Sequence, residues 1–238
     1  MRKGAEAAVG RQENSVGPAY AARMAEGYAE SAAGRFQFEE RERHVLRLLD
    51  RYHLMPLAGK EILEVGCGTG KWLRDLIAWG ADPHAIAGVE LLEASAVRAR
   101  RVCPPGVSIE TGNAALLSHP SGSFDIVLQA KLFTSILDDD VRRSIAAEML
   151  RVLRPNGIIV WYDLFMNNLG SSYLRPVTKE ELRHLFPGCL VDLRRVSLSP
   201  MLIRLVAPRS WSASTMLSRF APLCTHYLGA IRRPPMCS

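Results

Sequence analysis

One short stretch restricts the fold more than any other: an apolar segment that runs directly into three glycines at alternate positions. Ile62–Val65 has the character of a buried strand, and Gly66, Gly68 and Gly70 follow it, with a helical pattern from Lys71 onward. Glycine has no side chain, so the backbone can turn sharply there and a ligand can approach it closely. The stretch therefore predicts a strand, a tight turn and a helix, with a ligand bound at the carboxyl end of the strand.

The same pattern of strand and helix recurs along the chain. Short apolar runs alternate with segments of helical length, and the continuous apolar character of 158–161 suits a strand that is buried on both faces. The expected strands are 61–65, 85–90, 107–111, 124–129, 158–162, 190–198 and 224–232, and the expected helices among them are 71–79, 92–102, 139–153 and 178–186. This alternation predicts an α/β fold, a doubly wound and mostly parallel sheet with helices on both faces.

The string Glu64-Val65-Gly66-Cys67-Gly68-Thr69-Gly70 resembles motif I of the class I S-adenosylmethionine-dependent methyltransferases. In that family an acidic residue stands two positions before the first glycine. The third glycine comes one residue earlier than in the G-x-G-x-x-G turn of NAD-binding proteins. The resemblance continues through 124–127 and 153–157 and covers residues 58–163. It implies a Rossmann-like sheet of seven strands with an antiparallel last strand, and S-adenosyl-L-methionine as the cofactor.

The resemblance also implies roles for residues at the ends of the first four strands. The glycine turn would face the amino-acid part of the cofactor, and Glu64 would interact with that part, often through water. Glu90 would accept hydrogen bonds from the ribose hydroxyls, and Asn113 would accept one from adenine where the family usually has an aspartate. The residues expected to bind the cofactor are Glu64, Gly66, Cys67, Gly68, Gly70, Glu90, Leu91, Asn113, Ala114 and Gln129.

Catalytic residues are harder to predict, because methyl transfer mainly requires that the acceptor be aligned and a base is optional. Asp163, at the expected carboxyl end of the fifth strand, is the candidate general base; a helix or loop cap is the alternative role for this residue. No cluster of acids of the catechol-enzyme type is obvious, and the five cysteines include no C-x-x-C pair. We therefore expect no metal site.

The pattern predicts a single domain over residues 1–238. Residues 1–17 have the composition of a flexible tail, 18–57 are expected to form N-terminal helices, and 58–163 form the cofactor-binding core. Thr178 and Glu181 have the spacing of a capping box. Residues 199–223 are an apolar and basic insertion between the last two strands. We expect this insertion to be a lid over the acceptor, and contact with an anionic membrane is the alternative.

The positive charge lies at the C-terminal end. Residues 189–238 contain seven arginines and one acidic residue, which accounts for the full net charge of +6. Such a segment suits an anionic partner, although a solvated basic face would have the same composition. The first ten residues contain no apolar signal segment, and no apolar run is long enough to span a membrane. These features predict a cytoplasmic protein.

The sequence restricts the methyl acceptor only in part. The stretch 129–132 lacks the Asn/Asp-Pro-Pro-aromatic motif of amino-methylating DNA enzymes and the Pro-Cys context of cytosine C5 enzymes. Residues 161–168 and 178–186 loosely resemble the small-molecule and glycan-modifying branch of the family. We therefore expect O-methylation of a small molecule, a sugar or a lipid-linked glycan. An RNA or protein methyltransferase is the main alternative. A non-catalytic binding module and an NAD-dependent oxidoreductase have less support, and the oligomeric state stays open.

Overall fold

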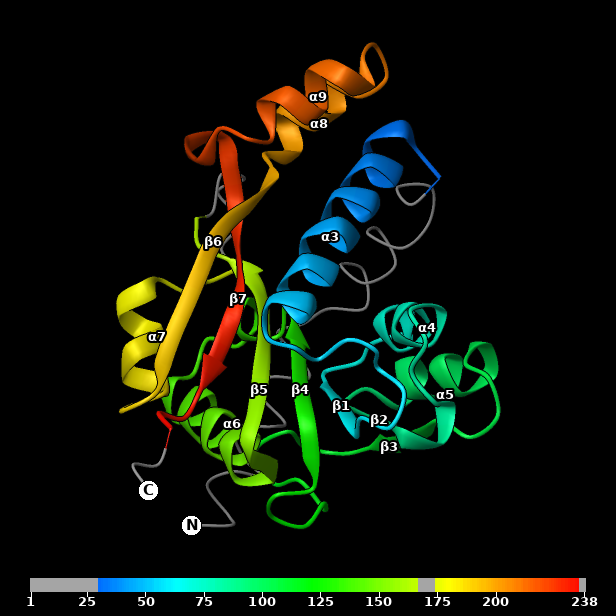
Figure 1. Cartoon of the computed structure of the whole chain (residues 1–238), viewed down its shortest axis with the longest axis vertical. Coiled ribbons are helices and arrows are strands. Elements are labelled where there is room, and N and C mark those ends of the chain that lie inside the picture. Colours follow the sequence, from blue (N-terminus) through cyan, green and yellow to red (C-terminus); the bar gives the residue numbers. More distant parts are fainter. Residues whose placement is uncertain (1–29, 167–173, 236–238) are drawn as a thin grey trace.

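The protein is built on a sheet of seven strands in the order β3-β2-β1-β4-β5-β7-β6 (Figure 1). The structure, a computed structural model, describes residues 30–166 and 174–235. The strands are β1 (Ile62–Val65), β2 (Ile86–Glu90), β3 (Ser108–Thr111), β4 (Phe124–Ala130), β5 (Leu153–Leu164), β6 (Leu190–Leu198) and β7 (Cys224–Arg232). Within this sheet β7 runs antiparallel to both of its neighbours, and the remaining pairs are parallel. The predicted Rossmann-like topology is confirmed.

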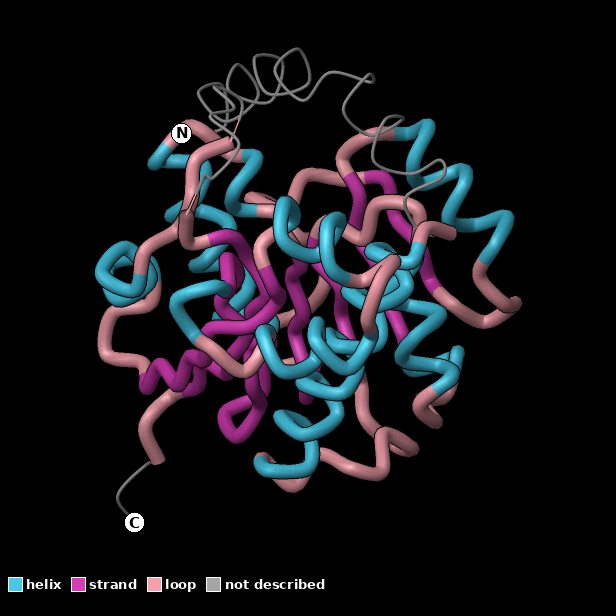
Figure 2. Tube along the Cα trace, turned by 90° about the horizontal axis from the view of Figure 1, so that it is seen from above, coloured by secondary structure: helices cyan, strands magenta, loops and turns pink. Residues whose placement is uncertain are grey.

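Helices cover both faces of the sheet (Figure 2). Those described are α3 (Ala32–Arg51), α4 (Lys71–Ala78), α5 (Glu93–Val102), α6 (Asp139–Val152), α7 (Lys179–Leu185), α8 (Pro200–Val206) and α9 (Trp211–Leu217). One apolar cluster joins α3 and α4 to the sheet, and another joins α6 and α7 to its opposite face. Trp161 belongs to the second cluster and Tyr162 to the first, because successive side chains of a strand point to opposite faces.

Most of the predicted strands and helices agree with the structure to within one residue at each end. The fifth strand is the exception, because the prediction of 158–162 was too short and β5 begins at Leu153. Leu153 already pairs with Phe124 of β4, and the register then shifts before Ile158 pairs with Ile126. A Cβ on Gly157 would lie 2.7 Å from the Asp125 carbonyl oxygen, so glycine is what allows the two backbones to approach here.

The N-terminal helix is shorter in the described residues than the helical pattern of 18–54. It begins at Ala32, where the Ser31 hydroxyl caps it by accepting a hydrogen bond from the Gly34 amide at 3.0 Å. Val45, Leu48 and Leu49 of this helix are buried against the sheet. Residues 1–29, including the predicted tail and the start of the predicted helix, lie outside the described residues.

Only half of the predicted capping box forms at α7. The Thr178 hydroxyl accepts a hydrogen bond from the Glu181 amide at 3.2 Å, as expected for a helix N-terminus. The Glu181 carboxylate accepts hydrogen bonds from Arg142 and Arg175, so the reciprocal half of the box was predicted wrongly. Arg142 is completely buried, and a buried guanidinium must have partners for its donors. The Glu181 carboxylate therefore pairs with the buried Arg142 instead of capping the N-terminus of α7.

Residues 199–223 form α8, α9 and a 3₁₀ turn, Ala221–Leu223. In Figure 1, β6 and β7 extend past the other strands and carry these helices at one end of the molecule. Ile203 and Ala207 pack against Phe36 of α3, and the Trp211 ring meets the Phe36 ring edge-on at a centroid distance of 5.0 Å. Apolar contacts therefore fix the insertion to α3, and its role as a lid stays a prediction.

An acidic side chain lies at the junction between α3 and this insertion. Glu40 is 1% exposed, and neither of its carboxylate oxygens has a hydrogen-bond partner. Burial raises the pKa of Glu40 to about 7, and nearby backbone groups of Leu198 and Ser197 oppose the shift only in part. A buried carboxylate without partners is costly when it is charged. The junction therefore favours the protonated form of Glu40.

This burial predicts a pH-dependent stability that a single substitution removes. Between an unfolded pKa near 4.5 and the folded pKa of about 7, the folded state binds a proton that the unfolded state releases. Glu40 should therefore lower the free energy of unfolding as pH rises through this window, by up to about 3 kcal/mol. Glu40→Gln should remove this contribution, so its stability relative to the wild type should increase as pH rises through the window. Urea unfolding on both sides of the window measures it. Glu39→Gln, at the exposed neighbouring position, should keep the wild-type dependence; an unchanged dependence in Glu40→Gln would contradict the prediction.

Candidate cofactor-binding site

The three glycines after β1 form a tight turn with left-handed backbone conformations. Gly66, Gly68 and Gly70 have φ angles of 74°, 54° and 74°, which residues with a side chain rarely adopt. A Cβ on Gly66 would lie 2.9 Å from a methyl group of Leu132, and one on Gly70 would lie 2.6 Å from the Cys103 sulfur. A Cβ on Gly68 would meet nothing within 4 Å. The outer two glycines therefore permit close packing, whereas the middle one faces open space.

The turn is held against the end of β2. The amides of Gly66 and Cys67 both donate to the Val89 carbonyl oxygen, at 2.8 and 3.1 Å. One carboxylate oxygen of Glu90 accepts a hydrogen bond from the Gly68 amide at 2.8 Å, and the other accepts one from the Leu92 amide at 3.0 Å. Each carboxylate oxygen has a further acceptor position. Glu90 is therefore fixed in place and still able to accept hydrogen bonds from a ligand.

A pocket opens beside this turn. Its lining consists of Gly66, Val89, Glu90, Leu91, Gly112, Asn113, Ala114, Leu132 and Ile145. Five of these residues were expected from the sequence. They lie at the carboxyl ends of parallel strands, which meet at the same end of the sheet. Val89, Gly112, Leu132 and Ile145 were not expected. Ile145 lies on the buried face of α6, and the helical period alone does not tell whether a residue on that face lines a pocket or packs in the core. Leu132 lies in the loop that follows β4.

Asn113 lines the pocket but already uses its amide oxygen. That oxygen accepts a hydrogen bond from the Ala115 amide at 2.9 Å, which closes a local turn after β3. An amide oxygen has two lone pairs, so one position stays available for an adenine amino group. The expected role of Asn113 is thus compatible with its local structural role.

The five other expected residues do not line the pocket, and four of them, Glu64, Cys67, Gly70 and Gln129, are buried. The Cys67 side chain packs against Gly88, where a Cβ would lie only 2.9 Å from the Cys67 sulfur. Burial raises the pKa of the Cys67 thiol. Glu64 is 1% exposed, with one carboxylate oxygen lacking a partner. Gln129 is fully buried; its oxygen accepts from the Leu132 amide at 3.2 Å, and its amide nitrogen lacks a partner.

Glu64 and Gln129 occupy neighbouring strand ends. Val65 and Gln129 are paired in the register of β1 and β4, so an unused acceptor and an unused donor lie close to the glycine turn. Burial raises the pKa of Glu64 well above its usual range, and the positive charge of Arg41 opposes this only in part. Because Gln129 pairs with Val65 rather than with Glu64, the two side chains point to opposite faces of the sheet, and each unused atom would need its own polar group or water as a partner.

Asp163 is more enclosed than its position at a strand end suggests. It is completely buried, and burial raises its pKa to about 6. Its carboxylate accepts hydrogen bonds from the Thr134 amide and hydroxyl and from the Leu164 amide. These bonds hold the loop after β4 against β5. The role of Asp163 as general base stays a prediction, and its observed contacts are structural.

A second group of residues lies beside the glycine turn and was not expected from the sequence. The Lys131 amide donates to the Tyr162 carbonyl at 2.8 Å, and the Tyr162 ring stacks on His226 with a centroid distance of 4.9 Å. The Tyr162 hydroxyl lies 2.9 Å from the hydroxyl of Ser197. Burial, together with the positive charges of Lys131 and Arg41, lowers the pKa of His226 to about 3. Lys131 directly follows β4, whereas Tyr162, Ser197 and His226 belong to β5, β6 and β7, and no single sequence motif links them.

Among the described residues, no group of three or more His, Cys, Asp or Glu side chains is placed to hold a metal ion. No helix in the described ranges has the length and apolar character that crossing a bilayer requires.

Known proteins resemble the chain in the region that contains the glycine turn. The profile of a family described as a methyltransferase domain matches residues 62–157. A probable S-adenosylmethionine-dependent methyltransferase of Mycolicibacterium smegmatis is 37% identical over 105 residues, which cover 43% of this chain and 37% of the relative. The phthiotriol/phenolphthiotriol dimycocerosates methyltransferase of Mycobacterium tuberculosis is 28% identical over 176 residues, which cover 74% of this chain and 61% of the relative.

The fold has relatives among solved structures. A TehB-like S-adenosylmethionine-dependent methyltransferase of Corynebacterium glutamicum superposes with a TM-score of 0.55 at 18% identity, covering 83% of this chain and 96% of that one. The chain spans less than two thirds of the length of the two curated relatives. The sheet order, the glycine turn and these similarities agree. Residues 62–157 thus match a methyltransferase-domain family, and the chain has the fold of S-adenosylmethionine-dependent methyltransferases.

Proposed function

We propose that the protein transfers a methyl group from S-adenosylmethionine to a hydroxyl oxygen of a small-molecule or lipid acceptor. The observation that carries this proposal is the geometry of the glycine turn. Glu90 fixes the Gly68 amide, and the space that a Cβ of Gly68 would occupy is open. A turn that is rigid and unobstructed suits the close approach of a ligand.

The pocket residues match the parts of this cofactor. Glu90 is positioned to accept hydrogen bonds from ribose hydroxyls, and Leu91, Leu132 and Ile145 offer apolar surface to a flat base. Asn113 retains an acceptor position for an amino group. When bound, the cofactor supplies an electrophilic methyl group on a sulfonium. The protein's task is then to align an acceptor and to exclude water.

The acceptor side of the site is best assigned to the ends of β4, β5 and β7. Lys131, Tyr162 and His226 lie there, next to the strand ends that carry the glycine turn. The lowered pKa of His226 keeps its ring neutral at physiological pH, so it can form a hydrogen bond with an acceptor hydroxyl without carrying a charge.

The similarity to the phthiotriol/phenolphthiotriol dimycocerosates methyltransferase supports a hydroxyl as the methylated group. Phthiotriol and phenolphthiotriol, which its name contains, are alcohols. Sugars and lipid-linked glycans also carry hydroxyls and belong to the same acceptor class. An RNA or protein acceptor is the alternative, and an acceptor screen with labelled cofactor distinguishes the two classes.

Substitution of the middle glycine should test the cofactor site. In Gly68→Ala the added methyl group would enter the open space, and the left-handed conformation would add about 1–2 kcal/mol of strain. This substitution should weaken the binding of S-adenosylmethionine by at least about tenfold, and NAD should bind neither the variant nor the wild type. Calorimetric titration measures both affinities.

Gly122→Ala is the matched control for this substitution. Gly122 has a φ of 66° and an equally open Cβ position. It precedes β4 and therefore lies at the amino-terminal ends of the parallel strands, away from the glycine turn. This variant should lose similar stability and keep the wild-type cofactor affinity. If Gly68→Ala binds the cofactor as tightly as Gly122→Ala does, the site has been placed wrongly.

The candidate base can be tested against its structural role. If Asp163 removes the acceptor proton, Asp163→Asn should lower turnover by about 10²–10⁴, and the loss of wild-type activity below pH 6 should disappear. The sign follows because a base with a pKa of about 6 is protonated and inactive at lower pH. Thr134→Val removes a partner of the carboxylate and should cost about 1–3 kcal/mol of stability, with turnover retained. Equal losses of turnover in the two variants would show that Asp163 acts through the loop that it holds.

A further inference from the structure

The outer side of the insertion is unusually apolar. Among the described residues, nine large apolar side chains are classed as exposed, and five of them belong to the insertion. These five are Met201, Leu205, Trp211, Met216 and Phe220. Met201 is 70% exposed and Met216 is 60% exposed. Apolar side chains concentrated in so short a segment commonly mark an interaction site.

The exposed residues follow the helical period. Met201 and Leu205 are four residues apart on α8, and Met216 and Phe220 have the same spacing along α9 and just beyond it. The buried residues of the two helices, Ile203 and Ser214, lie between the exposed positions. The helices therefore turn one side toward α3 and the core, and the other side, which is apolar, toward solvent.

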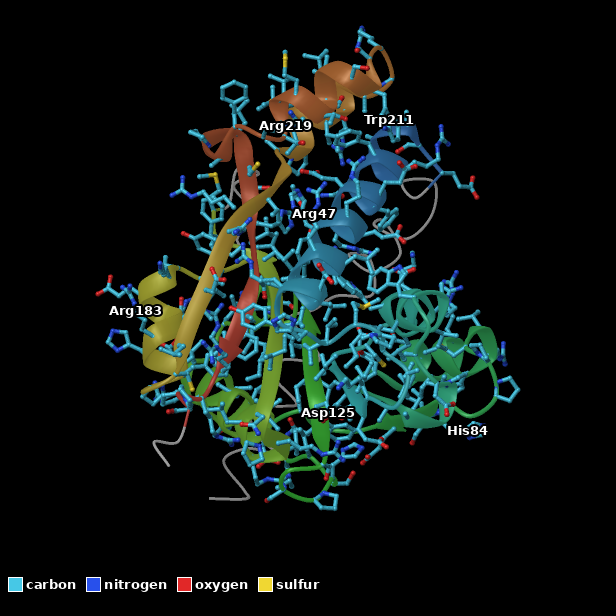
Figure 3. All side chains as sticks on the ribbon, in the orientation of Figure 1. Arg47, His84, Asp125, Arg183, Trp211 and Arg219 are labelled. Carbon is cyan, nitrogen blue, oxygen red and sulfur yellow. The ribbon has the colours of Figure 1, made fainter. Side chains whose placement is uncertain are left out.

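The charge of the insertion is entirely positive. Residues 199–223 contain Arg204, Arg209 and Arg219 and no acidic residue. Figure 3 shows Arg219 and Trp211 at the end of the molecule that α8 and α9 form, far from Arg183 on α7. An exposed apolar surface with arginines at its border has the character of an interfacial helix.

We propose that this surface, formed by the exposed side chains of α8, α9 and Phe220, docks on an anionic lipid bilayer. The apolar side chains would enter the boundary between headgroups and acyl chains, and the arginines would pair with lipid phosphates. Apolar burial and charge both contribute, with about 1 kcal/mol for each basic residue near such a surface.

Docking in this orientation has a consequence for the acceptor side. β7 begins at Cys224, directly after the insertion, and His226 pairs with Leu164 at the carboxyl end of β5. The membrane-facing helices are thus joined to the strand ends that we assign to the acceptor. The docking proposal does not depend on methyl transfer, because binding to vesicles is measured without cofactor or acceptor.

The composition of the surface argues against two other occupants. A symmetric dimer through this face would bring the same arginines of two copies together, with no acidic residue in the insertion to compensate. Single-stranded nucleic acids are commonly bound by stacking on aromatic side chains, whereas Met201, Leu205 and Met216 are aliphatic. The bilayer is the occupant that uses both the apolar and the basic residues.

Vesicle flotation tests the proposal with matched variants. The full chain should bind vesicles of phosphatidylcholine and phosphatidylglycerol, and it should bind phosphatidylcholine vesicles much more weakly. Met216→Glu combined with Phe220→Glu should lower binding to the anionic vesicles by at least about tenfold. Leu190→Glu, at an apolar position that is 43% exposed at the start of β6, should bind as the wild type does. Unchanged thermal unfolding and cofactor affinity would show that each variant is folded.

The role of charge is tested separately. Arg219→Glu should weaken binding and reduce its dependence on salt, whereas Arg183→Glu on α7 should change neither. The proposal is overturned if Met216→Glu/Phe220→Glu binds anionic vesicles as the wild type does, or if both vesicle types bind equally. It is also overturned if the wild type fails to float with anionic vesicles, or if the double variant abolishes a dimer in sedimentation and leaves vesicle binding unchanged.

Discussion

The hydrogen bond from the Gly68 amide to the Glu90 carboxylate links the two strand ends on which the rest of the site depends. It joins the turn after β1 to the end of β2, and the two amides that donate to Val89 reinforce the link. The pocket beside it exists because parallel strands bring their carboxyl ends to one edge. A ligand therefore meets a turn whose shape is already fixed, so that little ordering is required on binding.

Several buried polar atoms among the described residues lack hydrogen-bond partners, and some of them lie near the glycine turn or near the insertion. Glu64 and Gln129 leave one atom each unpaired near the glycine turn, and Glu40 leaves both oxygens unpaired where α3 meets the insertion. Such atoms reduce stability. At the glycine turn the cost is understandable, because a ligand or water can supply the missing partners. At Glu40 the burial that raises the pKa favours the neutral carboxyl, which avoids a buried charge where α3 meets the insertion.

The amino-acid sequence determined the order and the extent of most strands and helices. Apolar runs, helical periods and turn residues are local signals, and they placed β6 and β7 at the bounds that the structure shows. The string from Glu64 to Gly70 also predicted the tight turn after β1, because glycine at left-handed positions is a local requirement of the turn. Local signals failed at β5, where pairing with β4 extends the strand beyond its apolar run, and at Glu181, where the buried Arg142 takes the carboxylate.

Tertiary structure decided the parts of the site that distant segments share. Leu132 and Ile145 line the pocket only because α6 and the loop after β4 pack beside β1 and β2. Tyr162, Ser197 and His226 meet because β7 inserts antiparallel between β5 and β6. The sequence likewise determined that 199–223 is apolar and basic, whereas packing on α3 decided which of its side chains face solvent. A local pattern specifies how the chain turns, but which side chains share a pocket or a surface depends on long-range packing that the pattern does not encode.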